Sequence, residues 1–411
     1  MTAQPSQRRV GLLLGLSYLG FISLGLPDGL LGVAWPSIRT RFGLELDALG
    51  PLLVAATAGY VFASFSSGRL LARGHLGALL AASRFAAAGS LLGYALAPAW
   101  SVMVGFGLFA GIGAGLLDAA LNTYVATHHS PRTLNWVHAC YGVGAAIGPA
   151  LMTAVLLAGH PWQRGYAIVA IGQLALALCF VATRSSWTTA ASHAATPAAK
   201  LASNRATLAL PAAWFGMAAF FLAVGIEHSA GAWGYSFLTQ TRGVSVAAAG
   251  TWSTLFWAAL TAGRVVFGVV ANRFPIEALM RVALVAIAAG SALVAFDPFP
   301  VSAPIGLLTI GFATGPVFPL LIATTPARFG GAHAANGVGF QIGAAACGQA
   351  LIPWVVGGIA ERSSLEALGP ILLGLAVALV ALHELLRRHA VRVSARVAAA
   401  EGKPPRGGYQ P

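Results

Sequence analysis

The sequence predicts an all-α membrane protein with twelve transmembrane helices, and three observations support this fold class. Of 411 residues, 57% are hydrophobic and 9% are charged, whereas about 25% are charged in a typical soluble domain. Twelve apolar runs each reach the roughly 20 residues that a membrane span needs. Basic residues also gather in alternate connections between these runs. The chain therefore lacks the polar residues to cover a soluble surface, and it leaves no room for a large soluble domain.

The first apolar run follows Arg8 and Arg9. It is far longer than the apolar core of a signal peptide, which has about 7–15 residues. We therefore expect it to remain in the mature protein as the first span. The proposed spans cover residues 10–35, 47–71, 76–98, 101–127, 134–158, 165–184, 209–238, 247–271, 277–296, 301–326, 335–360 and 367–386.

The distribution of basic residues predicts the orientation. Seventeen of the 24 Lys and Arg residues fall in the termini and in one set of connections, and five fall in the opposite set. This positive-inside pattern requires an even number of spans with both termini in the cytoplasm. Arg84 and Arg264 lie within spans about two turns from a boundary, where snorkelling to the surface explains both. We expect a monomeric multi-pass protein of the cell inner (plasma) membrane.

The longest predicted inner connection is rich in Ala, Ser and Thr, as a flexible linker is. It separates two halves that resemble each other at a spacing of about 200 residues, which is typical of an internal repeat. Asp28 matches Glu227 in this register, and Gly50 matches Gly250. The predicted organisation is a six-helix bundle at 1–184, a cytoplasmic linker at 185–208, a second six-helix bundle at 209–390 and a cytoplasmic tail at 391–411.

One stretch, residues 111–149, carries the polar residues that point most directly to a function. Asp118 and Asn122 are four residues apart, so a helix places them on one face. In the next run, Asn135 and His138 also share a face. A carboxyl deep in an apolar helix costs about 2.5 to 3.5 kcal/mol on the insertion scale, so it must face another helix or a water-filled path. We interpret this hairpin as the wall of a polar cavity.

Three acids, Asp28, Asp118 and Glu227, lie deep within apolar spans. An acid kept from water rests protonated and releases its proton when it opens to water, so it can couple a proton to a conformational change. We therefore predict proton-coupling roles for all three. For Asp118 and Asp28 the alternative is a buried structural role. For Glu227 a salt bridge or hydrogen bond between helices is as good an explanation.

A small polar solute needs hydrogen-bonding groups and flat apolar faces, and the spans supply both. His138 could donate to a hydroxyl or relay a proton, and a satisfied histidine between helices explains it equally well. For His228 we favour the structural explanation. Amides also hold helices together, and Trp is common at the membrane surface. The candidate substrate contacts are Asn122, Asn135, His138, Asn336, Gln341, Tyr141 and Trp252, with Gln173, Gln349, Trp233 and Trp257 as further candidates.

Other classes of chemistry find little support in the sequence. Gly142, Gly144 and Gly148 resemble a dinucleotide loop, but such a loop needs a preceding strand and a later acid. The basic residues form no patch interleaved with aromatic residues, so we expect no nucleic-acid partner. No phosphate loop, metal-ligand spacing or nucleophile elbow is present. We therefore expect no cofactor, no metal site and no enzymatic activity.

The segments Asp118-Ala-Ala-Leu-Asn122, Asn135-Trp-Val-His138 and 142–149 resemble the fucose permease-like branch of the major facilitator superfamily. The resemblance extends over the whole chain. It implies the major facilitator fold and sugar import with protons, with Asp118 as the acid of span four. The branch also has an acid in span one, and alignment on Pro36 places Asp28 about one turn from it.

The resemblance leaves one alternative within the same fold. Residues 144–149 partly match the span-five motif of proton antiporters, although 150–153 replace its closing glycine pair. The alternative function is therefore proton-coupled export of small amphiphilic compounds. A non-transporting receptor or a membrane-embedded enzyme would be a different class. A receptor would be expected to carry a large soluble segment, and this sequence has no room for one. An enzyme would need a nucleophile or a set of metal ligands, and this sequence does not supply them.

Overall fold

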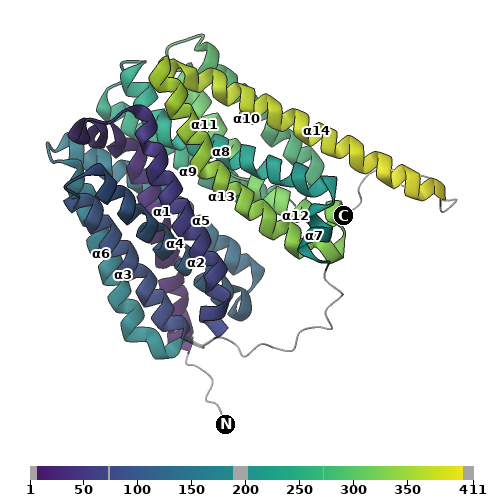
Figure 1. Cartoon of the computed structure of the whole chain (residues 1–411), viewed down its shortest axis with the longest axis horizontal. Helices are drawn as coiled ribbons and strands as arrows, with labels where there is room; N and C mark the ends of the chain where they lie inside the picture. Colours follow the sequence, from purple (N-terminus) through teal and green to yellow (C-terminus); the bar gives the residue numbers. More distant parts are fainter. Residues whose placement is uncertain (1–6, 73–74, 188–201, 272, 401–411) are drawn as a thin grey trace.

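The structure, a computed structural model, describes residues 7–72, 75–187, 202–271 and 273–400. All regular structure in these ranges is helical, and twelve helices are long and apolar enough to cross a membrane. The predicted fold class is therefore confirmed. Figure 1 shows the helices as two groups that follow each other along the chain. Most of the predicted linker, residues 188–201, lies outside the described residues, as does the end of the predicted tail.

The first group contains six spanning helices. Within it α1 packs along α5, α2 packs along α4, and α3 packs against both α4 and α6. A short 3-10 helix, η1 (Leu46–Ala48), precedes α2, and η2 (Arg184–Ser186) follows α6. The helices are α1 (Gln7–Phe42), α2 (Leu49–Ala72), α3 (Leu76–Leu96), α4 (Trp100–His128), α5 (Pro131–Leu157) and α6 (Trp162–Thr183).

The second group repeats this arrangement after the short helix α7 (Asn204–Leu208). Here α8 packs along α13, α9 packs on α11, and α10 packs on α11 and α14. The 3-10 helix η3 (Leu365–Ala367) precedes the last span. The helices are α8 (Pro211–Gln240), α9 (Val246–Val270), α10 (Ile276–Phe296), α11 (Ser302–Thr314), α12 (Val317–Phe329), α13 (Gly331–Arg362) and α14 (Leu368–Ala400).

The tenth span differs from the expectation of one continuous helix over 301–326. It breaks into α11 and α12 at Gly315 and Pro316. Proline has no amide hydrogen, so Pro316 and Pro319 remove the helical hydrogen bonds to the carbonyls of Phe312 and Gly315. The carbonyl of Gly315, which Pro319 cannot bond, instead lies 3.4 Å from Nε of Arg264 as a hydrogen-bond acceptor. The two prolines therefore explain the break, and Arg264 on α9 compensates for part of it.

The two bundles meet most tightly at the end that carries η1 and the C-terminal end of α13. There the backbone amide of Leu46 donates to the Glu361 carboxylate at 2.6 Å. A Cβ on Gly50 would collide with the Trp354 ring, and one on Gly357 would approach Asp47. At the opposite end, where α1 begins and α7 lies, the helices of the two bundles diverge (Figure 1). We call the end that carries η1 and the C-terminal end of α13 the closed end.

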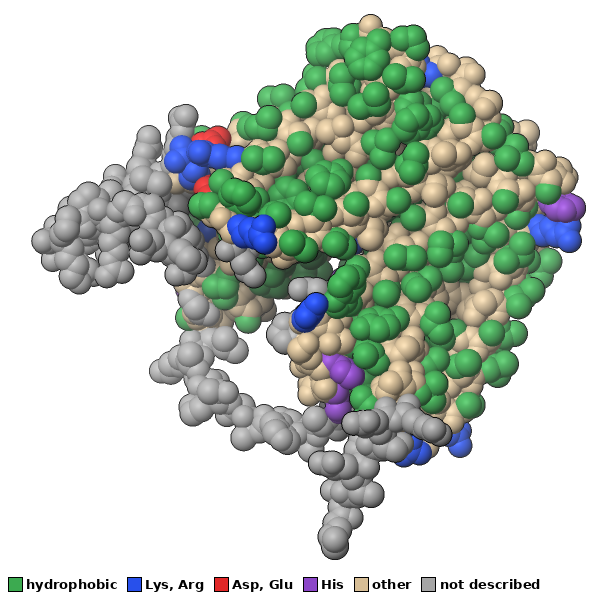
Figure 2. All heavy atoms as spheres, turned by 180° about the vertical axis from the view of Figure 1, so that it is seen from behind, with side chains coloured by type: hydrophobic (Ala, Val, Ile, Leu, Met, Phe, Trp, Pro, Cys, Tyr) green, Lys and Arg blue, Asp and Glu red, His purple; other side chains and the backbone are tan. Residues whose placement is uncertain are grey.

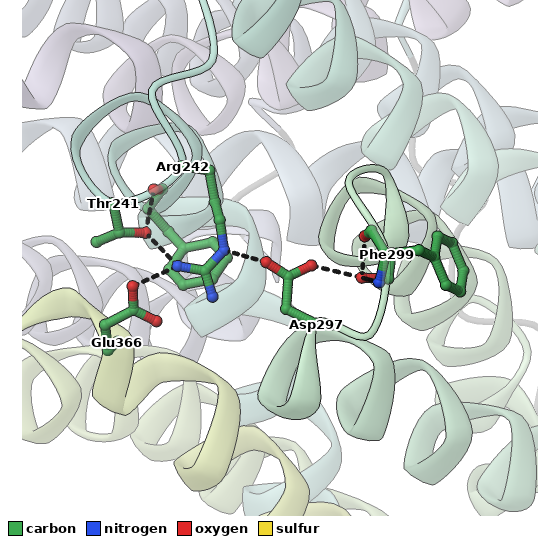
Figure 3. A network of polar contacts seen from close by, with 7 residues as sticks. Thr241, Arg242, Asp297, Phe299 and Glu366 are labelled. Carbon is green, nitrogen blue, oxygen red and sulfur yellow. Dashed lines mark hydrogen bonds and ion pairs between the residues drawn. The ribbon is translucent and has the colours of Figure 1, made fainter.

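A charged network also lies at the closed end, within the second bundle (Figure 3). Arg242, just after α8, pairs with Asp297 after α10 and with Glu366 of η3. Its guanidinium carbon lies 4.6 Å from the centroid of the Phe237 ring. The hydrogen bond to Glu366 raises the pKa of Arg242. Burial raises the pKa of Asp297, but the hydrogen bond from Ser302 and the charge of Arg242 outweigh it and lower that pKa. The network ties three helix ends together.

Arg84 corrects another expectation, because it does not snorkel to the surface. Its side chain is 1% exposed among α1, α3, α4 and α6. The guanidinium donates to Ser23 Oγ and Gln173 Oε1, both at 3.1 Å, and to the carbonyl of Gly113 at 2.8 Å. Pro27 cannot bond the carbonyl of Ser23, and Gln173 Nε2 donates to that carbonyl at 2.6 Å. Arg84 and Gln173 therefore hold the first bundle together.

The outer surface suits a hydrocarbon environment. Figure 2 shows one face of the molecule largely covered by apolar side chains, with most charged groups at its margins. Large exposed apolar side chains include Phe65, Leu96 and Ile171. In water such a surface would promote association, whereas lipid tails can cover it. The protein is therefore a multi-pass membrane protein.

Candidate transport site

A cavity lies between the two bundles and is lined by helices from both. It holds about 390 Å³ of space, part of it open to solvent. The lining residues are Asp28, Leu31 and Gly32 of α1, Leu53 of α2, His228 and Ala232 of α8, Trp257 of α9, and Gln349 and Pro353 of α13.

Asp28 brings a carboxylate to the wall of this cavity. It lies one residue after Pro27 on α1, and its Oδ2 accepts a hydrogen bond of 2.6 Å from the Tyr141 hydroxyl on α5. The two helices come close because Gly25 and Gly29 face the backbone of α5, where a Cβ would collide with carbonyl oxygens. The expected aromatic substrate contact, Tyr141, is therefore first a hydrogen-bond donor to an acid.

Asp118 has a similar environment on α4. Its Oδ2 accepts a hydrogen bond of 2.7 Å from the Tyr60 hydroxyl on α2. Its Oδ1 accepts a hydrogen bond of 2.9 Å from Nδ2 of Asn122, one turn further along α4. The side-chain oxygen of Asn122 is buried and has no hydrogen-bond partner among the described residues. The predicted stripe of acid and amide is therefore present, and one amide acceptor remains free for a donor.

A line of contacts connects these groups to the second bundle. The Arg264 guanidinium on α9 lies 6.0 Å from the centroid of the Tyr141 ring and 3.8 Å from the Glu227 carboxylate on α8. His138 on α5 is exposed and lies in the electrostatic range of both Asp118 and Arg264. Arg264 was expected to snorkel, and this expectation is wrong, because its charge is used at the contact between bundles.

The cavity contains a further unpartnered acceptor. Nδ1 of His228 bonds the carbonyl of Val224 at 3.1 Å. If Nδ1 carries the hydrogen, as a bond to a carbonyl requires, Nε2 is an acceptor. That nitrogen is buried without a partner in the described part of the chain. His228, for which the sequence favoured a structural role, therefore presents a polar atom beside Asp28 and Trp257 in the cavity lining.

Several predicted substrate contacts lie elsewhere in this structure. Gln341 is buried and accepts 2.8 Å from Thr325. Asn336 donates to the carbonyl of Ala202 at 2.7 Å, so it ties α13 to the segment before α7. Trp252 lines a separate apolar cavity between α8, α9 and α11. Asn135 lies on α5, but its side chain is outside the described residues. The structure brings Asn122, His138 and Tyr141 together with the acids.

Sequence reasoning did not single out Tyr60, and it gave Arg264 a different role. Tyr60 follows Gly59, just as Tyr141 precedes Gly142, so an aromatic residue beside a mid-span glycine was the available signal. Both glycines lie against a neighbouring helix, because a Cβ on Gly59 would meet the carbonyl of Leu108 and one on Gly142 would meet Thr261. Gly59 thus faces α4, the helix that carries the partner of Tyr60, whereas Gly142 faces α9 and not the helix that carries Asp28.

Comparison with known proteins places this geometry in a family. The sequence pattern of the Major Facilitator Superfamily matches residues 17–353. A curated relative, "Bypass of stop codon protein 6" of Saccharomyces cerevisiae (strain ATCC 204508 / S288c), is 25% identical over 403 aligned residues, which cover 88% of this chain and 79% of the yeast protein.

Solved structures agree with the family match at the level of the fold. The nucleoside transporter NupG superposes with a TM-score of 0.75 at 17% identity, covering 91% of this chain and 99% of the other. A D-xylose-proton symporter gives 0.70 at 14% identity, covering 90% and 97%. A bacterial homologue of the human lysosomal transporter Spinster, inward-facing and unoccupied, gives 0.69 at 17% identity, covering 94% and 96%. The chain belongs to the Major Facilitator Superfamily, and it is a membrane transporter and not an enzyme.

Proposed function

We propose that the protein is a secondary active transporter that moves a small polar solute, a neutral sugar, by proton-coupled alternating access. In this proposal it belongs to the fucose permease-like branch and lies in the cell inner membrane with both termini in the cytoplasm. The two bundles, 1–184 and 209–390, rock about the cavity between them, while the linker at 185–208 keeps them joined.

One observation carries the proposal: Asp28 lines the cavity between the bundles, and its carboxylate is bound by a neutral hydroxyl. A carboxylate without a fixed cationic partner can gain a proton at moderate cost, because no ion pair has to be broken. Because Asp28 lies between the bundles, a movement of the bundles would change which side of the membrane its carboxylate is open to. Asp118, also bound by neutral donors, meets the same chemical condition.

The remaining residues take supporting roles in this proposal. Asn122 and His138 contact the solute or its proton, with Asn135 contributing from the same helix as His138. Glu227, expected from the sequence to share the proton role, is paired with Arg264 and contributes its charge to that pair. His228, Gln349 and the Trp257 face line the cavity, where acceptors and an aromatic surface suit a ligand with several hydroxyl groups.

The comparisons support this substrate class without deciding it. One structural neighbour is named as a D-xylose-proton symporter and another as a nucleoside transporter, and both substrates carry several hydroxyl groups. Export of small amphiphilic compounds is the competing function. A binding screen of the purified protein over pentoses, hexoses, nucleosides and lipophilic cations separates these functions, because only an exporter of amphiphiles should prefer the cations.

The proton mechanism is tested in liposomes that contain the purified full-length protein and a radiolabelled sugar identified by the screen. With an alkaline lumen, the wild type should accumulate the sugar against its gradient. Asp118→Asn should abolish accumulation above the external concentration, because the amide cannot lose a proton, while exchange of sugar between the two sides continues.

Glu45→Gln is the matched control, since it neutralises an exposed acid before η1, outside the spans. It should accumulate sugar like the wild type. Sugar entry that ignores the pH gradient in the wild type would exclude proton coupling, and full accumulation by Asp118→Asn would remove Asp118 from the mechanism.

A further inference from the structure

The first bundle contains two carboxylate sites that are built in the same way. Asp28 on α1 accepts from Tyr141 on α5, and Asp118 on α4 accepts from Tyr60 on α2. The distances, 2.6 Å and 2.7 Å, are those of strong hydroxyl-to-carboxylate hydrogen bonds. If the first three helices of the bundle are matched with the last three, α1 corresponds to α4 and α2 corresponds to α5. The packing of α1 on α5 then corresponds to the packing of α4 on α2.

A glycine three residues before each acid lies against the backbone of the tyrosine. A Cβ on Gly25 would collide with the carbonyl of Tyr141, and one on Gly29, directly after Asp28, would collide with the carbonyl of Ala145. On α4 both glycines precede Asp118. There a Cβ on Gly111 would collide with the carbonyl of Ala56, and one on Gly115 would lie 2.6 Å from the carbonyl of Tyr60.

This packing has a chemical consequence. In each site the acid's helix lies directly on the backbone that carries the tyrosine, so the hydroxyl reaches the carboxylate. The Ser64 side chain, one turn further along α2, also lies within hydrogen-bonding range of the Tyr60 hydroxyl. The hydroxyl stabilises the ionised carboxylate by donation, and a protonated carboxyl does not need that donor. Each pair therefore responds to the gain of a proton.

Other charged and titratable groups act on the two sites, from several helices. His138 and Arg264 lie near Asp118 and Tyr141, while Arg84 is directed to Ser23, Gln173 and Gly113 instead. The groups within electrostatic range of Asp28 are Tyr60 on α2, Tyr94 on α3, Tyr141 on α5, Tyr166 on α6, and Glu227 and His228 on α8. Among the described residues, the two tyrosine hydroxyls named above are the groups that hydrogen-bond these carboxylates from another helix.

We infer that Tyr60 and Tyr141 are positioning residues of two equivalent proton sites, and that Asp118 and Asp28 each exchange one proton during the transport cycle. The inference rests on the proposed proton-coupled function and extends it to two sites with matched partners. The tyrosines do not transfer the proton. They hold each carboxylate in the orientation in which it accepts the tyrosine hydrogen bond.

The test is an infrared titration of purified full-length protein, which needs no solute. A protonated carboxyl group has its own C=O stretching band, and this band disappears as the pH rises. All 11 Asp and Glu side chains absorb when they are protonated, so the bands of the two sites are isolated as differences between the wild type and a variant. The wild type minus Asp28→Asn should give one titrating band, and the wild type minus Asp118→Asn should give another.

The tyrosine variants supply the readout that a structural role would not change. Tyr60→Phe should move the titration of the Asp118 band upward by about one pH unit, because the ionised form loses one donated hydrogen bond. Tyr141→Phe should do the same to the Asp28 band, and each variant should leave the other band within about half a unit. Tyr18→Phe, on α1 but about 15 Å along the helix from Asp28, is the matched control and should move neither band.

The outcomes separate this inference from the proposed function. A difference spectrum that lacks a titrating band for either aspartate, or tyrosine variants that leave both bands unmoved, would overturn the two-site inference even if liposomes accumulate sugar with a pH gradient. If a Phe variant folds poorly, the aspartate variants still report whether each of the two carboxyls titrates. Absence of pH-driven accumulation in the wild type would instead overturn the proposed function.

Discussion

The two bundles hold their membrane-embedded acids in different ways. In the first bundle, tyrosine hydroxyls and an amide bind Asp28 and Asp118. In the second bundle, Glu227 lies 3.8 Å from Arg264, and its side chain is 7% exposed. The sequence repeat aligns Asp28 with Glu227, yet the partners of the two acids differ in charge.

This difference decides which acid is suited to which task. A neutral donor lets a carboxylate accept a proton without leaving a second charge unpaired. A partly buried ion pair favours the ionised acid, because protonation would leave the arginine without a counter-charge. We therefore expect the first bundle to exchange protons and the second to keep a fixed pair at the contact with Tyr141 of the first bundle.

The largest effect on stability should come from breaking the fixed pair. Glu227→Gln should lower the free energy of unfolding by about 3 kcal/mol, because it leaves the Arg264 charge without its partner in a mostly buried site. Asp28→Asn, whose amide oxygen can still accept from Tyr141, should cost less than about 1 kcal/mol. Denaturation of both variants in detergent measures the contrast.

The same pair of variants also separates stability from transport. Glu227→Gln should retain pH-driven accumulation, whereas Asp28→Asn should lose it. Equal stability losses in the two variants, or loss of accumulation in both, would show that the two bundles do not differ in the way we describe.

A smaller effect should follow from widening the approach between α1 and α5. Gly25→Ala should cost about 2 kcal/mol, since its Cβ would collide with the carbonyl of Tyr141, and backbone cannot move aside as a side chain can. Gly105→Ala on α4 is the control, because nothing lies within 4 Å of the added Cβ. It should be neutral or slightly stabilising. Similar melting shifts in both variants would contradict the close-approach account of the Asp28 site.

The smallest effect should arise at the closed end, far from the proton sites. Asp297→Asn should cost about 1 kcal/mol at neutral pH through loss of its pair with Arg242. Residue 297 has a φ of 41°, and asparagine adopts this left-handed conformation readily. The substitution therefore removes the charge without straining the backbone. The pKa of Asp297 is lowered in the fold. Its stabilisation is therefore present above the unfolded value of about 3.9 and is lost as the pH falls through the folded value.

Melting temperatures of the wild type and Asp297→Asn across acidic and neutral pH measure this dependence. The two curves should differ near neutrality and converge at low pH. A difference that persists unchanged below about pH 3 would show that Asp297 stabilises the network in some other way than through its charge.

The architecture could be predicted from the sequence because membrane spans leave a one-dimensional signal. Long apolar runs and charge-poor composition predicted the twelve helices, and the family match agrees. The break at Gly315 was missed because the apolar run continues across it, while Pro316 and Pro319 interrupt only the backbone hydrogen bonds. Hydropathy does not register that change.

The site could be predicted only in part because helix-to-helix contacts have no signal in spacing along one chain. Asp118 and Asn122 were found together, since a single helix fixes their geometry. Tyr60 and Arg264 reach their partners across helices, so their roles became visible only with the packing of α2, α4, α5 and α9. Asn336 had the polar character of a contact residue, but its position at the end of α13 places it against the segment before α7.

Proton movement during sugar entry tests the central claim most directly. Liposomes that contain the wild type and a trapped pH-sensitive dye, with no initial pH gradient, receive the sugar from outside. We expect the lumen to acidify as the sugar enters, and we expect Asp118→Asn to show no acidification. Sugar entry into wild-type liposomes without acidification of the lumen would contradict the account.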